Sequence, residues 1–146
     1  MNTRQWRVMS ILTLLLMAAT LVASTLLGGC GGQLELASGG NVPMKCHWAF
    51  MATAFTSLVG CVSATCAFFS KGAEARRMTT LLSLIISIAC GILPSSAAIG
   101  VCGGAEMGCQ TTTAIIWALT GCAAIISIVQ LMRADPMGAQ KPKMHL

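Results

Sequence analysis

The chain has 146 residues, of which 55% are hydrophobic and only 9% are charged, and it contains no tyrosine. Soluble domains carry charges on about a quarter of their residues, so this composition excludes an ordinary soluble domain and predicts a small membrane protein. The net charge of +5 is distributed over short segments that flank apolar stretches, which indicates membrane topology and argues against nucleic-acid binding.

Four uncharged stretches follow one another along the chain, each of roughly 20 residues, the length that an α-helix needs to cross about 30 Å of hydrocarbon. In chain order they are Val8–Leu27, Trp48–Phe69, Met78–Gly100 and Thr111–Met132. The sequence therefore predicts an all-α fold, with four transmembrane helices that form a single membrane domain over residues 1–146.

The start of the first stretch allows a second interpretation. A basic segment, an apolar run and small residues precede Cys30, which is also typical of a signal that is cleaved at a cysteine and lipid-anchored there. The apolar run is longer than the 7–15 residues of a typical signal core, so we expect a transmembrane helix. Lipidation of Cys30 stays open, and Cys30 lies outside the cytoplasm in both cases.

Lysine and arginine predict the orientation, because short segments that are rich in them stay in the cytoplasm. They precede the first span, join the second to the third and follow the fourth: Arg4, Arg7, Lys71, Arg76, Arg77, Arg133, Lys141 and Lys143. Only Lys45 falls on the other side. Both termini are therefore predicted to be cytoplasmic, with two outer loops at about Gly28–His47 and Val101–Gln110.

The two halves of the chain resemble each other. Each has a basic flank, a span, a Gly-rich turn ("GGCGG" or "GVCGG"), a Met-x-Cys ("MKC" or "MGC") and a second span. Each second span also carries a Gly-Cys pair at mid-depth, Gly60-Cys61 and Gly121-Cys122. The pattern predicts two tandem, similar hairpins in the same orientation.

Small residues recur with a spacing of four on the second and fourth spans, and we expect them to face the bundle interior because small side chains let helices approach in lipid. The predicted packing positions are Thr53, Ser57, Gly60, Cys61, Thr65, Ala114, Ala118 and Cys122. Gly91 and Pro94 predict a kink in the outer half of the third span, since proline removes a backbone donor.

The eight cysteines form two groups. Those within spans, Cys61, Cys66, Cys90 and Cys122, are expected to act as small hydrophobic side chains. The others lie outside, where disulfides persist: Cys30, Cys46, Cys102 and Cys109. Four cysteines allow three pairings, and the duplication favours Cys30–Cys46 and Cys102–Cys109. Closing a loop of about 15 residues contributes roughly 3 kcal/mol, so a structural brace is the first interpretation.

Thiol redox chemistry is an alternative. Lys45 and His47 flank Cys46 and could stabilise its thiolate. Four helices with two outer cysteine pairs also describe, in outline, the membrane enzymes that pass electrons between thiols and a quinone, which include vitamin K epoxide reductase. Those enzymes typically carry a Cys-x-x-Cys motif, and this sequence has none.

A soft-metal site is the third interpretation. Thioether, thiolate and imidazole donors suit Cu(I), or zinc without the thioethers, and the candidates are Met44, Cys46, His47, Met107 and Cys109. None of the established Cys/His ligand spacings is present, so no cofactor is expected.

The spans contain no acid or base, whereas proton-coupled transporters and intramembrane hydrolases usually carry one. Four spans would also be few for a transporter that acts alone, although a homodimer would double them. We therefore expect no catalytic residue.

Two segments carry a resemblance to a known family. "PMKCHW" before the second span and "IGVCGGAEMGCQTTTAIIWAL" before the fourth are similar to the bacterial domain-of-unknown-function 4418 family, small four-span membrane proteins. The first motif falls on residues 44–48, and the second on residues 100–103, Met107 and Cys109. Gln110 follows the second Met-x-Cys where His47 follows the first, so a ligand set shared symmetrically between the repeats is not expected.

The resemblance brings no biochemical function, but it implies a bacterial cytoplasmic membrane and a setting. Members are often encoded beside ABC-transporter ATPases and large FtsX-type permeases, which makes such proteins the expected partners. We therefore expect a non-catalytic accessory subunit of an ABC-type export or cell-envelope machine, with disulfide-braced outer loops. A membrane thiol-disulfide oxidoreductase and a copper- or zinc-binding membrane protein are the alternatives.

Overall fold

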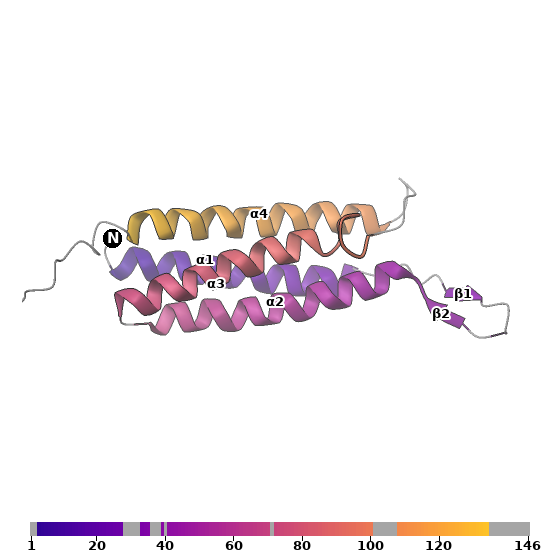
Figure 1. Ribbon diagram of the computed structural model, residues 1–146, viewed down its shortest axis with the longest axis horizontal. Helices are drawn as coiled ribbons and strands as arrows, with labels where there is room; N and C mark the ends of the chain where they lie inside the picture. The colour runs from indigo at the N-terminus through magenta and orange to yellow at the C-terminus, as the bar shows by residue number, and fades with distance from the viewer. Residues whose placement is uncertain are drawn as a thin grey trace, which may run out of the picture.

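The computed structural model describes residues 3–27, 33–35, 39, 41–70, 72–100 and 108–134, and these form an antiparallel bundle of four helices (Figure 1). The helices are α1 (Thr3–Val22), which a π-helix continues over Ala23–Leu27, α2 (Lys45–Phe69), α3 (Ala73–Ile92) and α4 (Gly108–Ala134). All four are long and apolar enough to span a membrane, with mean hydropathy between 1.4 and 2.2. The predicted fold class is confirmed.

A short antiparallel strand pair, β1 (Gln33–Glu35) and β2 (Asn41–Pro43), lies between α1 and α2 and was not predicted. It projects from one end of the bundle, which we call the hairpin end (Figure 1). The opposite end holds the start of α1, the α2–α3 connection and the end of α4. We call it the basic end because it carries Arg4, Arg7, Arg76, Arg77 and Arg133. Each helix packs against its neighbours in sequence, and α1 packs against α4 to close the bundle.

Small polar side chains fill much of the interior of the bundle, whereas large apolar side chains cover its outer surface. Buried side chains include Ser10, Thr20, Thr53, Ser57, Thr80, Ser87 and Ser127. Exposed ones include Leu26, Phe55, Phe69, Met78, Ile125 and Met132. This arrangement is the reverse of a soluble bundle, and it fits lipid, where large apolar side chains face hydrocarbon and small ones let helices approach. The chain is therefore a multi-pass membrane protein.

The buried hydroxyls are satisfied within their own helices. Thr53 Oγ1 donates to the Ala49 carbonyl at 2.9 Å, and Ser57 Oγ donates to the Thr53 carbonyl at 2.7 Å. Burying an unpaired hydroxyl would cost free energy, and a bond to the carbonyl four residues earlier removes that cost. Other hydroxyl groups bond across to a neighbouring helix, as Ser63 Oγ of α2 does at 2.7 Å from Ser83 Oγ of α3.

The third predicted span differs from the structure. Helix α3 ends at Ile92, and Pro94, which has no N–H to continue the helix, follows in a turn. The Ser95 N–H donates to the Ile92 carbonyl at 2.9 Å. This bond joins residues three apart instead of four, so the turn is tighter than that of an α-helix. The expected kink at Gly91 and Pro94 is therefore wrong, because the helix ends there, and so is its predicted continuation to Gly100.

All four helices begin earlier than the predicted spans, and for α2 and α4 this changes the place of the outer cysteines. Helix α2 begins at Lys45 and α4 begins at Gly108, so the first turn of each contains residues that were assigned to outer loops. Cys46 and Cys109 consequently belong to helices, and the rigid backbone of each first turn sets their positions.

The inner face of α4 was also predicted wrongly. Ala114, Ala118 and Cys122 lie on its exposed surface, whereas Ile116, Thr120, Ala123 and Ser127 are buried. On α2, Ser57 and Gly60 are buried, Cys61 is half-buried and Thr65 is exposed. Small residues occur on both faces of α4, so a spacing of four cannot by itself select the face that packs.

Candidate functional site

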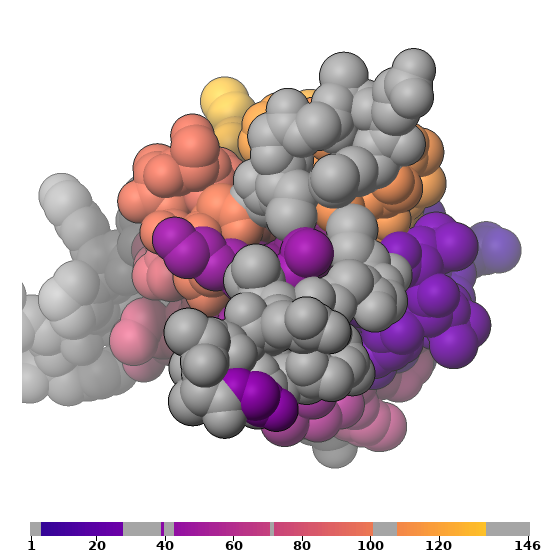
Figure 2. Space-filling view, turned by 90° about the vertical axis from the view of Figure 1, so that its right-hand side faces the viewer, coloured from indigo at the N-terminus to yellow at the C-terminus, as the bar shows by residue number. Residues whose placement is uncertain are grey.

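Two of the four predicted outer cysteines, Cys46 and Cys109, come together at the hairpin end. Cys46 of α2 is fully buried and Cys109 of α4 is 2% exposed, and both belong to one cluster with Phe50 and Ile116. Met44 packs against this cluster. Figure 2 looks onto this end, where the end of α1 (violet), the turn after α3 (salmon) and the start of α4 (orange) lie around the edge. Residues of the two sequence halves thus share one apolar environment, which the spacing did not reveal.

The cations that flank Cys46 in sequence lie at the surface. Lys45 and His47 are exposed, whereas Cys46 is fully buried. The His47 ring packs edge-on against Trp48, with centroids 5.8 Å apart. His47 therefore lies at the surface and not in the buried cluster, and the expected stabilisation of a Cys46 thiolate by its sequence neighbours has no support from this arrangement.

The predicted soft-metal ligands are only partly brought together. Met44, Cys46 and Cys109 share the cluster, while His47 is exposed and Met107 lies outside the described residues. Within residues that the structure describes, no group of three or more His, Cys, Asp or Glu could hold a metal ion. What remains is a set of two cysteine sulfurs and one thioether, which suits Cu(I) better than zinc.

Each predicted disulfide includes one cysteine that lies outside the described residues. Cys30 and Cys102, one partner in each expected bridge, lie among residues 28–32 and 101–107. No disulfide joins two of the described cysteines. The pairing of Cys30 with Cys46 and of Cys102 with Cys109 therefore stays a prediction.

The four cysteines within spans have different surroundings. Cys90 is buried on α3, and its Sγ lies 3.7 Å from Ser57 Oγ of α2. Cys61 is half-buried, while Cys66 and Cys122 are exposed on the outer surfaces of α2 and α4. The exposed pair gives two thiols at membrane depth on different helices.

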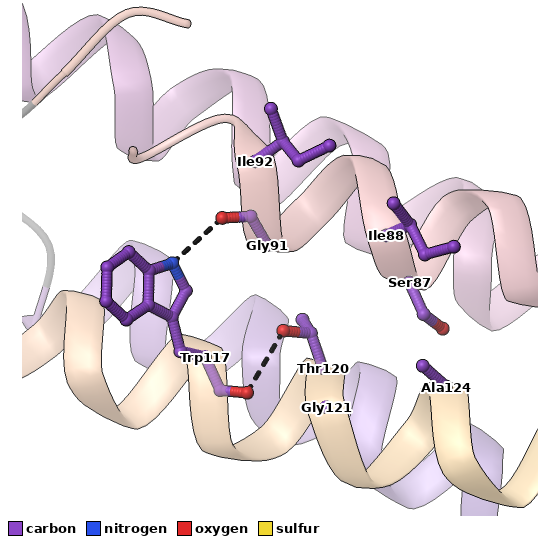
Figure 3. Close-up of a pocket in the computed structure, with 8 residues that line it drawn as sticks. All are labelled: Ser87, Ile88, Gly91, Ile92, Trp117, Thr120, Gly121 and Ala124. Atoms are coloured by element: carbon purple, nitrogen blue, oxygen red, sulfur yellow. Dashed lines mark hydrogen bonds between the residues drawn. The ribbon is translucent and has the colours of Figure 1, made fainter. Parts of the chain in front are cut away.

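A groove of about 240 Å³ opens between α3 and α4 (Figure 3). It is lined by Ser87, Ile88, Gly91 and Ile92 of α3 and by Trp117, Thr120, Gly121 and Ala124 of α4. Five of these eight residues are glycine, alanine, serine or threonine, so the groove exists because small side chains leave the space between two helices unfilled. Sequence reasoning did not identify it.

Trp117 bridges the two walls of this groove. Its Nε1–H donates to the Gly91 carbonyl at 2.8 Å, and the side chain is about half exposed (Figure 3). In a continuing α-helix, that carbonyl would accept from the Ser95 N–H, which here donates to Ile92 instead. Trp117 therefore caps one of the last carbonyls of α3, which a helix end leaves without a partner.

The groove continues onto an exposed surface of small residues. A Cβ atom added at Gly121 would have no atom within 4 Å, so the backbone is open to the outside there. Ala114, Ala118 and Cys122 lie on the exposed side of the same helix. They follow Gly121 around the outer side of α4, and we call the groove together with these three residues the α3/α4 face.

Ionisable residues of the described helices, other than cysteine, lie near helix ends. They are Arg4, Arg7, Lys45, His47, Glu74, Arg76, Arg77 and Arg133. Neither the cysteine cluster nor the α3/α4 face therefore holds a carboxylate or an imidazole among the described residues. Such a surface can bind through shape and apolar contact, and the cluster can offer thiol chemistry.

Comparison with known proteins gives a single assignment. A family model described as "Domain of unknown function (DUF4418)" matches residues 7–133, which include most of α1 and α4 and all of α2 and α3. No curated protein and no solved structure matches the chain.

Proposed function

The chain belongs to the domain-of-unknown-function 4418 family, as its motifs predicted, and from that premise we propose that it is a non-catalytic accessory subunit of a larger membrane machine. The α3/α4 face docks a transmembrane helix of the partner. The observation that carries this proposal is that the groove and the small residues beside it are exposed at membrane depth, although small residues usually mark helix–helix contacts.

The physics of helix association in lipid supports this use of the face. Lipid tails are as apolar as the side chains, so helices associate through close van der Waals contact rather than through the hydrophobic effect. Gly121 and Ala118 permit that close approach on α4. The half-exposed indole of Trp117 adds a rigid edge against which a partner helix packs.

The position of ionisable groups supports a non-catalytic role. Proton transfer or hydrolysis within a membrane generally uses an acid or base inside the spans. The described acids, bases and arginines lie near helix ends, away from the α3/α4 face. The role that this geometry favours is contact rather than chemistry.

The partner that we propose is the permease of an ABC-type export or cell-envelope system in the bacterial cytoplasmic membrane, acting with its ATPase. The family resemblance supports this partner, and the distribution of arginine and lysine supports cytoplasmic termini. The outer loops are braced by Cys30–Cys46 and Cys102–Cys109 and form a rigid cap toward the same partner.

The cysteine cluster supports a second candidate function. Met44, Cys46 and Cys109 come together from two helices, and two cysteines in their reduced state with a thioether form a donor set for Cu(I). A soft-metal protein needs these thiols reduced, whereas the braced subunit needs Cys46 and Cys109 oxidised. The state of the thiols therefore separates the two candidates.

A photo-crosslinking experiment tests the docking proposal. Cys122 and Cys66 are both exposed within spans but lie on α4 and α2, so a benzophenone side chain introduced at each gives a matched pair. We expect a crosslink from position 122 to an ABC permease in native membranes, and none from position 66. Gly121→Leu, which fills the face, is expected to abolish co-purification of that permease.

Two results would contradict the proposal. Equal crosslinking from positions 122 and 66 would show that the α3/α4 face has no special role. A crosslink from position 122 to a second copy of the chain alone would replace the accessory subunit with a homodimer.

A further inference from the structure

A cavity of about 250 Å³ lies at the basic end between the start of α1 and the end of α4. It is lined by Arg4, Gln5, Val8 and Met9 of α1 and by Arg133 of α4. Figure 1 shows these two helix ends at the same end of the bundle. The lining of the cavity thus combines two guanidinium groups and an amide with one valine and one methionine.

The arginines of this end are not equivalent. Arg7 lies over the ring of Phe68, with 5.7 Å from its guanidinium carbon to the centroid. Arg76 lies over the Trp6 ring at 5.5 Å, and its Nε donates to the Ser70 carbonyl at 3.1 Å. Within the described part of the chain, neither Arg4 nor Arg133 makes a hydrogen bond or an ion pair. The two arginines that line the cavity are therefore available to a ligand.

Helix electrostatics does not account for the position of Arg4. It lies in the first turn of α1, where the helix dipole is positive and disfavours a cation. Arg133, in the last turn of α4, is favourable for its own helix. The rule that places cations on one side of the membrane explains why both are at this end, but not why both line one cavity.

We propose that this cavity binds the phosphate of an anionic phospholipid. Guanidinium groups bind phosphate through paired, charge-assisted hydrogen bonds, and basic pockets between transmembrane helices bind anionic headgroups. Gln5 adds a neutral donor for the glycerol or headgroup oxygens. Among the described residues that line the cavity, only Arg4 and Arg133 are charged, so the ligand that it selects carries negative charge.

The size of the cavity suits a headgroup rather than a whole lipid. Pockets for drug-sized molecules measure about 300–1,000 Å³, and this cavity is smaller. The acyl chains then lie outside it, along the exposed apolar side chains Val8, Leu12 and Leu15 that continue from it along α1. The arrangement places charge at the interface and hydrocarbon against the helix.

This site is independent of the docking proposal. The lipid cavity lies between α1 and α4, whereas the docking surface lies between α3 and α4. An experiment that contradicts the lipid site would therefore leave the docking proposal unchanged, and the reverse also holds.

The test measures lipid preference in the full chain, purified in a non-ionic detergent. Thermal unfolding is followed with added phosphatidylglycerol or phosphatidylcholine, and native mass spectrometry counts bound lipid. We expect phosphatidylglycerol to raise the unfolding temperature more than phosphatidylcholine. The double variant Arg4→Gln with Arg133→Gln should bind phosphatidylglycerol at least tenfold more weakly, whereas Arg77→Gln, at the same end but outside the cavity, should bind it as the wild type does.

The wild-type protein supplies a second measurement, which does not depend on the folding of any variant. Raised salt should weaken phosphatidylglycerol binding, because the contact is between exposed charges. Equal binding of the two lipids, or an equal loss with Arg77→Gln, would overturn the site. Stabilisation by glycerol phosphate equal to that by phosphatidylglycerol would show a soluble phosphate site instead of a lipid site.

Discussion

Gly60 and Gly121 occupy matching positions in the two halves of the sequence but meet different surroundings. A Cβ atom at Gly60 would lie 2.9 Å from Met17 Sδ of α1 and 3.2 Å from Ile86 Cγ2 of α3. At Gly121 the same atom would meet nothing within 4 Å. One glycine therefore brings three helices together, while the other leaves an open outer surface.

This difference predicts opposite effects of one substitution. Gly60→Val forces Met17 and the stiff side chain of Ile86 to move, and overpacking of this kind costs about 1–3 kcal/mol. Gly121→Val, the matched control, should change the free energy of unfolding of the isolated chain by less than about 0.5 kcal/mol. Equilibrium unfolding in mixed micelles measures both values, and similar losses would show that α2 does not pack as closely as the structure places it.

At the scale of elements, the ends of helices are held by other helices. The Trp117 indole of α4 caps the Gly91 carbonyl of α3 at 2.8 Å. At the hairpin end, Thr112 Oγ1 of α4 donates to the Leu27 carbonyl at 3.1 Å, at the end of the π-helix that extends α1. In lipid no water is present to satisfy such carbonyls, so each needs a donor from the protein. Because α4 supplies both donors, these bonds connect it to the two helices that it packs against.

The Trp117 cap gives the prediction at this scale. Trp117→Phe keeps an aromatic ring but removes the donor, and leaving the Gly91 carbonyl unsatisfied costs about 1–3 kcal/mol. Trp48 is similarly exposed, and its ring contacts His47, so Trp48→Phe is the matched control with an expected loss below about 0.5 kcal/mol. Thermal unfolding in detergent, together with hydrogen exchange in the last turn of α3, measures the effect. Unchanged exchange there in Trp117→Phe would argue against a capping role.

At the scale of the whole molecule, the two ends of the bundle differ in chemistry. The basic end carries five arginines and an anion-binding cavity, while the hairpin end carries Cys46, Cys109 and Met44 in one buried cluster. If arginines mark the cytoplasmic side, the thiols lie toward the oxidising side, where disulfides persist. One orientation of the bundle in the membrane therefore fits both proposals, because it places the lipid site on the cytoplasmic side and the disulfides on the outer side.

The state of the thiols is the prediction at this scale. We expect alkylation of the denatured, unreduced protein to modify Cys61, Cys66, Cys90 and Cys122, and to modify the outer four only after reduction. Peptide mapping should then recover Cys30 with Cys46 and Cys102 with Cys109. Modification of Cys46 and Cys109 without reductant, with close to one copper bound per chain, would instead support the soft-metal candidate.

Much of the candidate site could not be read from the sequence because it depends on contacts between distant segments. Met-x-Cys motifs drew attention to Cys46 and Cys109 but assigned them to two separate loops. The capping role of Trp117 depends on where α3 stops and on tertiary packing. Pro94 is the signal in the sequence for the end of α3, because it has no N–H to donate to the carbonyl of Cys90, four residues earlier.

The sequence by itself determined the class of the protein, the number of its helices and the family, because apolar length and short motifs are local properties of the chain. Only the tertiary structure decided which face of each helix is inside. On α4, small residues occur all round, and packing against α1 and α3 buried Thr120 and Ser127 while it left Ala118 and Cys122 outside. The reason is that lipid and the bundle interior are both apolar, so hydrophobicity distinguishes spans from loops but not one face of a span from another.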